Sequence, residues 1–355
     1  MKAKRHLTGK LAAVFAAATL TLFSGQPAES ATADDAKLTI HGAGATFPQP
    51  LYQRWIQEYE KTHPETRFTY AGLGSGAGVQ GFLAGSIDFG ASDAAMNDAE
   101  LARVDPERGV VMLPMTAGMV VLAYNIPDVP TGLRLPRDVY LDLFAGRIRD
   151  WDHPRIRDAN PDLDLPHKAV VTVVRRDSSG TTFAFTNHLA AVDPDWADKG
   201  PGVGKLVDWP GIAMAVPGNE GVAQRVKITD GAIGFMAYEF AQRLGLPVAT
   251  LQNKSGTFVA PGPRTGQAAL ASVTDIPADL RIYLPDPEGA DAYPIVSYTW
   301  LLLSQRYADP AVAGALKGAI TWGLDQGQPI AEEMGYIPLP EVMIGKAKEA
   351  LARVR

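Results

Sequence analysis

Residues 173–182 have the clearest potential for chemistry, and they read Val-Val-Arg-Arg-Asp-Ser-Ser-Gly-Thr-Thr. The β-branched run predicts a strand, and the small polar residues predict a turn into a helix over 181–191. Arg175 and Arg176 end the strand, and Asp177 begins the turn. Because a helix N-terminus offers free backbone N–H groups and the positive end of a dipole, this order of residues predicts a site for an oxyanion.

An earlier stretch has the same order of strand, glycine turn and helix. A short strand over 37–40 leads into His-Gly-Ala-Gly-Ala-Thr-Phe, and Pro48 and Pro50 then open a helix. We expect the glycines to lie in the turn and the amides of Thr46 and Phe47 to point outward. A plain tight turn is the alternative interpretation.

A third such stretch follows, with a strand over 67–70, a glycine-rich turn over 72–78, a helix over 79–84 and a strand over 87–89. Its Gly72-Leu-Gly-Ser-Gly-Ala77 also fits a dinucleotide-binding pattern. Asp93 comes just after the last of these strands, where ligands bind in open α/β sheets. Asp93 could instead be the N-cap of a helix that begins at 94.

The composition is that of a folded protein long enough for two domains. Of the 355 residues, 46% are hydrophobic and 20% are charged. Cysteine is absent, which excludes disulfides, cysteine-based metal sites and a lipid-modified cysteine at a signal junction.

The first 33 residues predict an export signal that is removed. Four basic residues at positions 2, 4, 5 and 10 precede an apolar run over 11–23, and small residues follow at 31–33. The run is too short for a permanent membrane span, although an uncleaved anchor is the alternative. We therefore expect a periplasmic protein that is neither lipidated nor inserted in a membrane.

The charge balance argues against nucleic acid and anionic lipid as partners. Residues 1–33 hold four of the 33 Lys and Arg and one of the 39 Asp and Glu, so the remainder carries a net charge of −9. An acidic protein must bind an anion through local geometry.

Two long apolar segments predict crossings between two lobes. Residues 110–126 form either two buried strands or one strand that passes between lobes, and residues 293–303 form the return. Helices are expected over 138–146, 309–324 and 340–354, and a polar loop over 253–266. Together these elements describe an α/β clamshell with a hinge.

Four motifs in this order give the chain a resemblance to a known family. They are Gly42-Ala-Gly-Ala-Thr-Phe-Pro48, Gly72-Leu-Gly-Ser75, Asp88-Phe-Gly-Ala-Ser-Asp93 and Arg175-Arg-Asp-Ser-Ser-Gly-Thr181. With them, the mature chain resembles the periplasmic phosphate-binding proteins of bacterial high-affinity phosphate ABC transporters.

The resemblance implies a two-lobed, hinged periplasmic-binding-protein fold of type II, with a mixed sheet flanked by helices in each lobe. Lobe I would comprise 34–116 and 292–355, and lobe II 117–291. The function implied is high-affinity binding of inorganic phosphate by a monomer without cofactors, and its delivery to a membrane permease.

The resemblance also implies which residues contact phosphate. Asp93 would accept a proton from the ligand, and Asp177 would hold the arginine. Arg175 takes the family's arginine position, and Arg176 would replace it only if the turn were shifted. Gly76 stands where many members have a serine, which would remove a hydroxyl. The contact residues implied are Thr46, Phe47, Ser75, Asp93, Arg175, Ser179, Gly180 and Thr181.

Elementary chemistry supports a role for Asp93 in selectivity. Phosphate at neutral pH carries a proton that a buried carboxylate can accept, whereas sulfate has none to give. Arsenate shares the protonation of phosphate, so this criterion does not separate the two.

Other functions remain as alternatives. A phosphatase would need a nucleophile or metals, and neither H-E-x-x-H nor G-x-S-x-G occurs. An exported protein would meet little dinucleotide cofactor. A receptor fold for another oxyanion, or a role as an adhesin or sensor, stays open.

Overall fold

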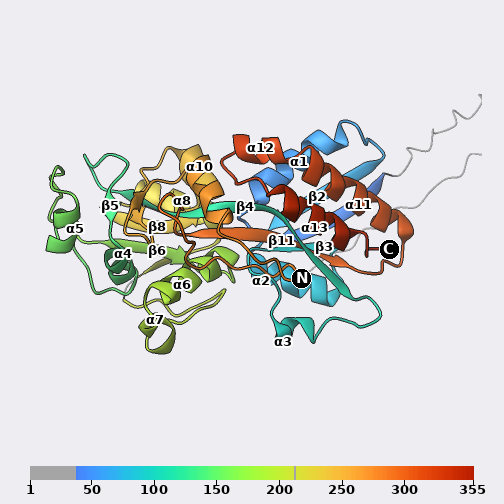
Figure 1. Cartoon of the computed structure of the whole chain (residues 1–355), viewed down its shortest axis with the longest axis horizontal. Helices are drawn as coiled ribbons and strands as arrows, with labels where there is room; N and C mark the ends of the chain where they lie inside the picture. The colour runs from blue at the N-terminus through green and yellow to red at the C-terminus, as the bar shows by residue number, and fades with distance from the viewer. Residues whose placement is uncertain (1–36, 212) are drawn as a thin grey trace, which may run out of the picture. The chain divides into compact units, whose positions relative to one another are not determined.

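The computed structural model describes residues 37–355 apart from residue 212, and the predicted export signal lies outside this range. Strands and helices alternate through most of the described chain (Figure 1). The strands are β1 Leu38–Gly44, β2 Thr66–Gly72, β3 Phe89–Ser92, β4 Val110–Asn125, β5 Arg134–Leu135, β6 Val171–Arg175, β7 Met214–Val216, β8 Ala232–Ala237, β9 Thr250–Gln252, β10 Phe258–Val259 and β11 Val296–Ser304.

The helices range from single turns to the 16 residues of α11. They are α1 Gln49–Glu60, α2 Ser75–Ala84, α3 Asp98–Leu101, α4 Arg137–Phe144, α5 Pro154–Ala159, α6 Gly180–Val192, α7 Asp195–Asp198, α8 Gly218–Ile228, α9 Tyr238–Leu244, α10 Pro263–Leu270, α11 Pro310–Asp325, α12 Gln328–Glu333 and α13 Glu341–Leu351.

Eight of the strands form one mixed sheet in the order β2-β1-β3-β11-β4-β8-β6-β7. In its two outer parts β1 is parallel to β2 and β3, and β6 is parallel to β7 and β8. The central strands β4 and β11 are antiparallel to their neighbours. In Figure 1, α1, α2 and α11 lie to one side of this centre, and α4, α6 and α8 lie to the other. The predicted two-lobed α/β fold is confirmed.

β4 is the physical link between the two halves of the sheet. It pairs with β11 as far as Met119 and with β8 from Val120 onward, so one 16-residue strand serves both halves. Of the two predictions for residues 110–126, the single crossing strand is therefore the correct one. The predicted lobe bounds at 116/117 and 291/292 stay a prediction.

A bulge explains how β4 tolerates a proline in the middle of a sheet. Trp300 of β11 pairs with Pro114 and Thr299 with Thr116, so Met115 is the extra residue on β4. Proline has no backbone N–H group to donate between strands, so within a sheet it is confined to bulges and edge strands.

The glycines of the first motif lie in a strand and not in the predicted turn, because β1 continues to Gly44. A Cβ atom on Gly42 would lie 2.0 Å from the ring of Phe89, and one on Gly44 would lie 2.0 Å from the carbonyl oxygen of Ala91. Gly44 also has a φ of +145°, which favours glycine. These glycines allow β1 and β3 to approach closely.

Several other predicted bounds were wrong. Helix α2 begins at Ser75 and not at 79, and β3 covers 89–92 and not 87–89. The predicted loop over 253–266 contains β10 and the start of α10. Asp93 is not an N-cap, since α3 begins later and Asn97 caps it by accepting a hydrogen bond from the Glu100 amide at 2.8 Å.

The close packing of α2 against β1 and β3 generates a test of the fold. A Cβ atom on Gly78 would lie 2.5 Å from the Ala91 carbonyl oxygen and 2.7 Å from the Cα atom of Gly44. Gly78→Ala should lower the free energy of unfolding by about 1–3 kcal/mol, because backbone atoms must move apart. Urea denaturation measures this change.

Gly314→Ala is the matched control, since Gly314 is exposed in α11 and no atom outside its chain neighbours and the backbone of its own helix lies within 4 Å of the added methyl group. It should raise the free energy of unfolding by roughly 0.5–1 kcal/mol. Equal effects of the two substitutions would contradict the packing described here.

Candidate functional site

Two of the predicted turns are in direct contact. The Gly76 amide donates to the Ser178 carbonyl oxygen at 2.9 Å, which joins the start of α2 to the turn before α6. Ser75 Oγ accepts the Gly180 amide at 3.0 Å and the Asp93 amide at 3.1 Å. Residues more than 100 positions apart therefore meet at the hydroxyl of Ser75.

Glycine at positions 76 and 180 permits this contact. A Cβ atom on Gly76 would lie 2.2 Å from Ser178 Oγ, and one on Gly180 would lie 2.6 Å from both Ser75 Oγ and the Asp93 Cβ atom. In this chain Gly76 therefore leaves room for Ser178. The sequence alone indicates only that a hydroxyl is lost at this position.

Arg175 is the buried arginine of the pair, and its side chain is 1% exposed, whereas Arg176 is exposed. Its Nε donates to Asp177 Oδ1 at 2.8 Å, its Nη2 donates to Asp177 Oδ2, and its Nη1 lies 3.5 Å from Thr181 Oγ1. Asp177 also accepts the Gly218 amide at 3.0 Å. Burial raises the pKa of Asp177, but its bonds to Arg175 and Gly218 outweigh this and hold the pKa below its usual value.

Asn219, which the sequence argument missed, connects two of the predicted residues. Its backbone N and Nδ2 donate to Thr46 Oγ1 at 3.2 and 3.0 Å, and its Nδ2 also donates to Thr181 Oγ1 at 3.3 Å. The signal was present in the Pro-Gly-Asn-Glu-Gly opening of α8, but no local pattern shows which residues its side chain meets.

Four hydroxyls at the site share one property: each accepts hydrogen bonds, and none donates to another described residue. Thr46, Ser75 and Thr181 each accept two, and Ser179 Oγ accepts the Thr182 amide at 3.1 Å as the N-cap of α6. All four residues are buried. Since a hydroxyl carries one proton and two lone pairs, their protons stay available for a ligand that accepts.

Asp93 is the one acceptor left open among these donors. Its side chain is buried, and Oδ1 has no hydrogen-bond partner among the described residues. Burial raises the pKa of Asp93 to about 7, although the nearby Thr299 hydroxyl, the Arg175 charge and the Ser75 hydroxyl lower it in part, without either hydroxyl forming a hydrogen bond to Oδ1. A buried, unpartnered carboxylate oxygen calls for a group that brings a proton.

The N-terminus of α1 adds further donors. Neither the Thr46 nor the Phe47 amide donates to another residue in the described part of the chain, and no side chain caps this helix. Phe47 is fully buried, and its carbonyl oxygen accepts the Tyr336 hydroxyl at 2.7 Å. Tyr336 was missed by the sequence argument because it lies 289 residues away.

Lys205 is a third missed residue, and it fixes the turn before α6. Its carbonyl oxygen accepts the Ser179 amide at 2.7 Å, and its Nζ pairs with Glu100 at 2.6 Å. This ion pair is largely buried and joins the loop at 205 to α3.

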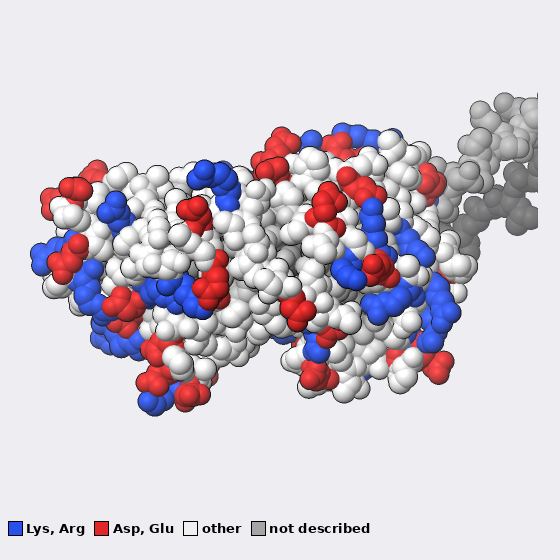
Figure 2. All heavy atoms as spheres, in the orientation of Figure 1, with Lys and Arg blue, Asp and Glu red and all other residues white. Residues whose placement is uncertain are grey.

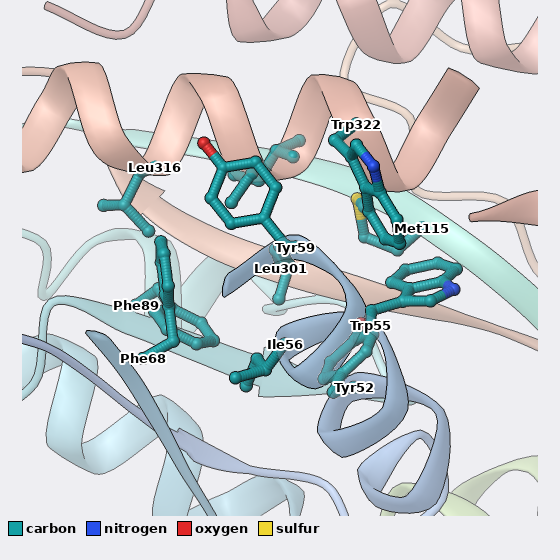
Figure 3. Close-up of a pocket in the computed structure, with 12 residues that line it drawn as sticks. Tyr52, Trp55, Ile56, Tyr59, Phe68, Phe89, Met115, Leu301, Leu316 and Trp322 are labelled. Atoms are coloured by element: carbon teal, nitrogen blue, oxygen red, sulfur yellow. The ribbon is translucent and has the colours of Figure 1, made fainter. Parts of the chain in front are cut away.

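A strongly apolar pocket in the described part of the chain lies away from these residues. It has a volume of about 60 Å³ between α1, α11 and the sheet, and none of its twelve lining side chains is charged (Figure 3). Tyr52, Trp55, Phe68, Phe89 and Trp322 are among the lining residues. It offers an anion no ionic partner.

The face of the protein shown in Figure 2 does not gather basic side chains into one large patch. On the face shown in Figure 2, acidic and basic side chains are interspersed. Among the described residues, no group of three His, Asp or Glu side chains is placed to hold a metal ion. None of the described helices combines the length and apolar character that a membrane crossing requires.

Comparison with known proteins identifies relatives that match most of the chain. The sequence model of the PBP superfamily domain matches residues 26–326. The phosphate-binding protein PstS of Methanocaldococcus jannaschii is 38% identical over 325 residues, which cover 86% of this chain and 83% of that protein. PstS of Pasteurella multocida is 37% identical over 310 residues, covering 87% of this chain and 88% of its own.

Solved structures show the same fold at lower identity. The high-affinity periplasmic phosphate-binding protein PfluDING, solved with phosphate bound, has a TM-score of 0.74 at 22% identity, over 88% of this chain and 93% of its own. The phosphate-binding protein of Stenotrophomonas maltophilia has a TM-score of 0.69 at 20% identity, and the match covers 88% of this chain and 94% of that protein.

The raised pKa of Asp93 predicts a pH-dependent stability of the ligand-free protein. A group whose pKa is higher in the folded than in the unfolded state stabilises the fold below the unfolded pKa, and that contribution is lost as the pH rises through the folded value. For Asp93 the two values are 3.8 and about 7. The loss is on the order of 4 kcal/mol, since one pKa unit corresponds to about 1.4 kcal/mol.

Asp93→Asn removes this ionisation. The unfolding free energy of the variant relative to the natural protein should therefore rise steadily between about pH 4 and pH 8. Denaturant titrations in phosphate-free buffer measure it. A difference that stays constant over this range would show that the Asp93 carboxyl is not destabilised by burial.

Proposed function

The chain belongs to the PBP superfamily and to the PstS phosphate-binding proteins, and from this we propose that it binds inorganic phosphate and delivers it to the membrane permease of an ABC-type importer. Its relatives are named for phosphate binding and match most of its length. We further propose that the protein is exported to the periplasm, that it acts as a monomer, and that it has no catalytic activity.

One observation carries the proposal: four buried hydroxyls, none of which donates to another described residue, lie at the turns described above together with one buried carboxylate whose Oδ1 atom has no hydrogen-bond partner among the described residues. Phosphate offers several oxygens that accept and one hydroxyl that donates. A set of donors with a single acceptor matches that pattern. A sulfate ion would leave the Asp93 oxygen unmatched.

In this proposal the contacts come from both halves of the sheet. Thr46, Phe47 and Ser75 would contribute hydroxyl and amide donors next to α1 and α2. Ser179, Gly180 and Thr181 would do the same at α6, although in this structure the Gly180 amide donates to Ser75 Oγ. Asp93 would accept the proton of the ligand.

Arg175 would supply the positive charge, and Asp177 would hold it in place. Asp177 accepts two hydrogen bonds from the guanidinium group, which leaves Nη1 as the nitrogen directed toward Thr181. A second anion beside the ligand is tolerable because the Arg175 side chain and the Gly218 amide already satisfy the oxygens of Asp177.

The direct bonds between the halves of the sheet support a hinged mechanism. Gly76 to Ser178, Gly180 to Ser75 and Lys205 to Glu100 all join elements on opposite sides of β4 and β11. Rotation about the central strands would break these bonds and release the ligand to the permease. We place the lobe bounds at 116/117 and 291/292.

Calorimetry tests the proposed ligand. The protein, freed of bound anions, should bind one phosphate per chain and should bind sulfate far more weakly. In Asp93→Asn, the ratio of sulfate to phosphate dissociation constants should fall by about 100-fold, because the amide no longer presents an unmatched charge to sulfate. An unchanged ratio would exclude the selectivity mechanism, and the absence of phosphate binding by the natural protein would exclude the function.

A pair of arginine variants tests the charged contact. Arg175→Met should weaken phosphate binding by about 100-fold or more, since the variant loses a buried cation and leaves Asp177 unpaired. Arg176→Met is the matched control at an exposed position and should change the affinity by less than about threefold. The reverse result would show that the turn presents Arg176 to the ligand.

A further inference from the structure

Asn219 occupies a position that links three parts of the structure. It lies in the first turn of α8 and is fully buried. Its backbone N and Nδ2 both donate to Thr46 Oγ1, its Nδ2 also donates to Thr181 Oγ1, and its Oδ1 accepts the Ala237 amide at 3.0 Å. One side chain therefore connects the turn before α1, the first turn of α6 and the end of β8.

The orientation of the Asn219 amide follows from its partners. The backbone N–H of Ala237 can only donate, so the side-chain atom that faces it is the oxygen. The NH₂ group must then face the two threonine hydroxyls. Reversal of the amide would place two N–H groups against each other and leave both hydroxyls without this donor.

This orientation determines what the two hydroxyls can do. Thr46 Oγ1 receives two N–H groups from Asn219, which occupy both of its lone pairs. Thr181 Oγ1 receives one from Asn219, and Arg175 Nη1 lies at 3.5 Å. Because the lone pairs of each hydroxyl already accept hydrogen bonds, the hydroxyl can form a further hydrogen bond only as a donor. A hydroxyl without these partners could rotate to donate or to accept.

We propose that Asn219 is a positioning residue that makes the Thr46 and Thr181 hydroxyls obligatory donors to the bound anion, an inference that rests on the proposed binding of phosphate. Asn219 itself does not contact the ligand. Because its amide bonds to both hydroxyls at once, it also keeps the donors of α1 and α6 in register.

Asn219→Asp is the decisive variant. The carboxylate keeps the bond from the Ala237 amide, but its second oxygen accepts where Nδ2 donated, so the threonine protons turn toward it and away from the ligand. At about pH 8 the phosphate dissociation constant should rise by about 100-fold relative to the natural protein. Protonation of the new carboxyl restores a donor, so this ratio should fall as the pH decreases to about 5.

Asn219→Ala gives a second, independent measurement. It removes the donor without adding an acceptor, so the dissociation constant should rise by about tenfold, with no change of the ratio between pH 8 and pH 5. If Asn219→Asp shows no cooperative unfolding transition, the alanine variant decides the matter.

Asn125→Asp is the matched control, because it makes the same change in charge at an exposed amide that donates to the Lys227 carbonyl oxygen at 3.0 Å. Its phosphate dissociation constant should stay within about twofold of the natural value. A natural protein that does not bind phosphate would refute the proposed function and this inference with it. If the natural protein binds phosphate, the inference alone is overturned when Asn219→Asp and Asn219→Ala bind within about twofold of it. It is overturned likewise when the effect of Asn219→Asp does not vary with pH.

Discussion

The structure depends on one constraint: an anion taken out of water needs a partner for each of its polar atoms, and the protein needs a partner for each of its own. The site meets this constraint with hydroxyl donors whose lone pairs are wholly or partly occupied by other donors. Ser75 accepts two backbone amides, Thr46 accepts two N–H groups of Asn219, and Ser179 accepts an amide of its own helix. Against these donors stands one acceptor, the Oδ1 atom of Asp93, which no described residue satisfies. Selectivity then follows from protonation, since only an oxyanion that carries a proton can donate to Asp93 Oδ1 while it accepts from the hydroxyl and amide donors.

The arrangement of the strands brings the donors and the acceptor of the site together. The ends of β1, β3 and β6 lead to the turns that hold the site, and the long antiparallel strands β4 and β11 keep the two parallel parts of the sheet in one framework. Glycines at 42, 44, 76 and 180 leave room for neighbouring backbone or side-chain atoms at distances that a Cβ atom would not permit. These glycines contribute space, and among the described site residues the positive charge is that of Arg175. An acidic chain can therefore hold an anion, because helix N-termini and amides act at contact range.

The sequence predicted the features that are local. The order of strand, turn and helix predicted the turns in which Thr46, Ser75, Asp93, Ser179 and Thr181 lie, and the family resemblance implied the ion pair of Arg175 and Asp177. The pattern could not predict contacts made by residues distant in the chain. Asn219 reaches Thr46 across 173 positions, and Tyr336 reaches Phe47 across 289. The bounds of β1 and β3 were missed for a related reason: glycine is a turn residue by propensity, but here the close approach of two strands requires it.

Neutron diffraction from crystals of the phosphate complex tests the central claim most directly, because it locates the protons on which the account depends. We predict deuterium density that points from the hydroxyls of Thr46, Ser75 and Thr181 to phosphate oxygens, and one further deuterium between a phosphate oxygen and Asp93 Oδ1. Hydroxyl deuterium atoms directed at protein acceptors, or an Asp93 Oδ1 atom beyond hydrogen-bond distance of the ion, would contradict it.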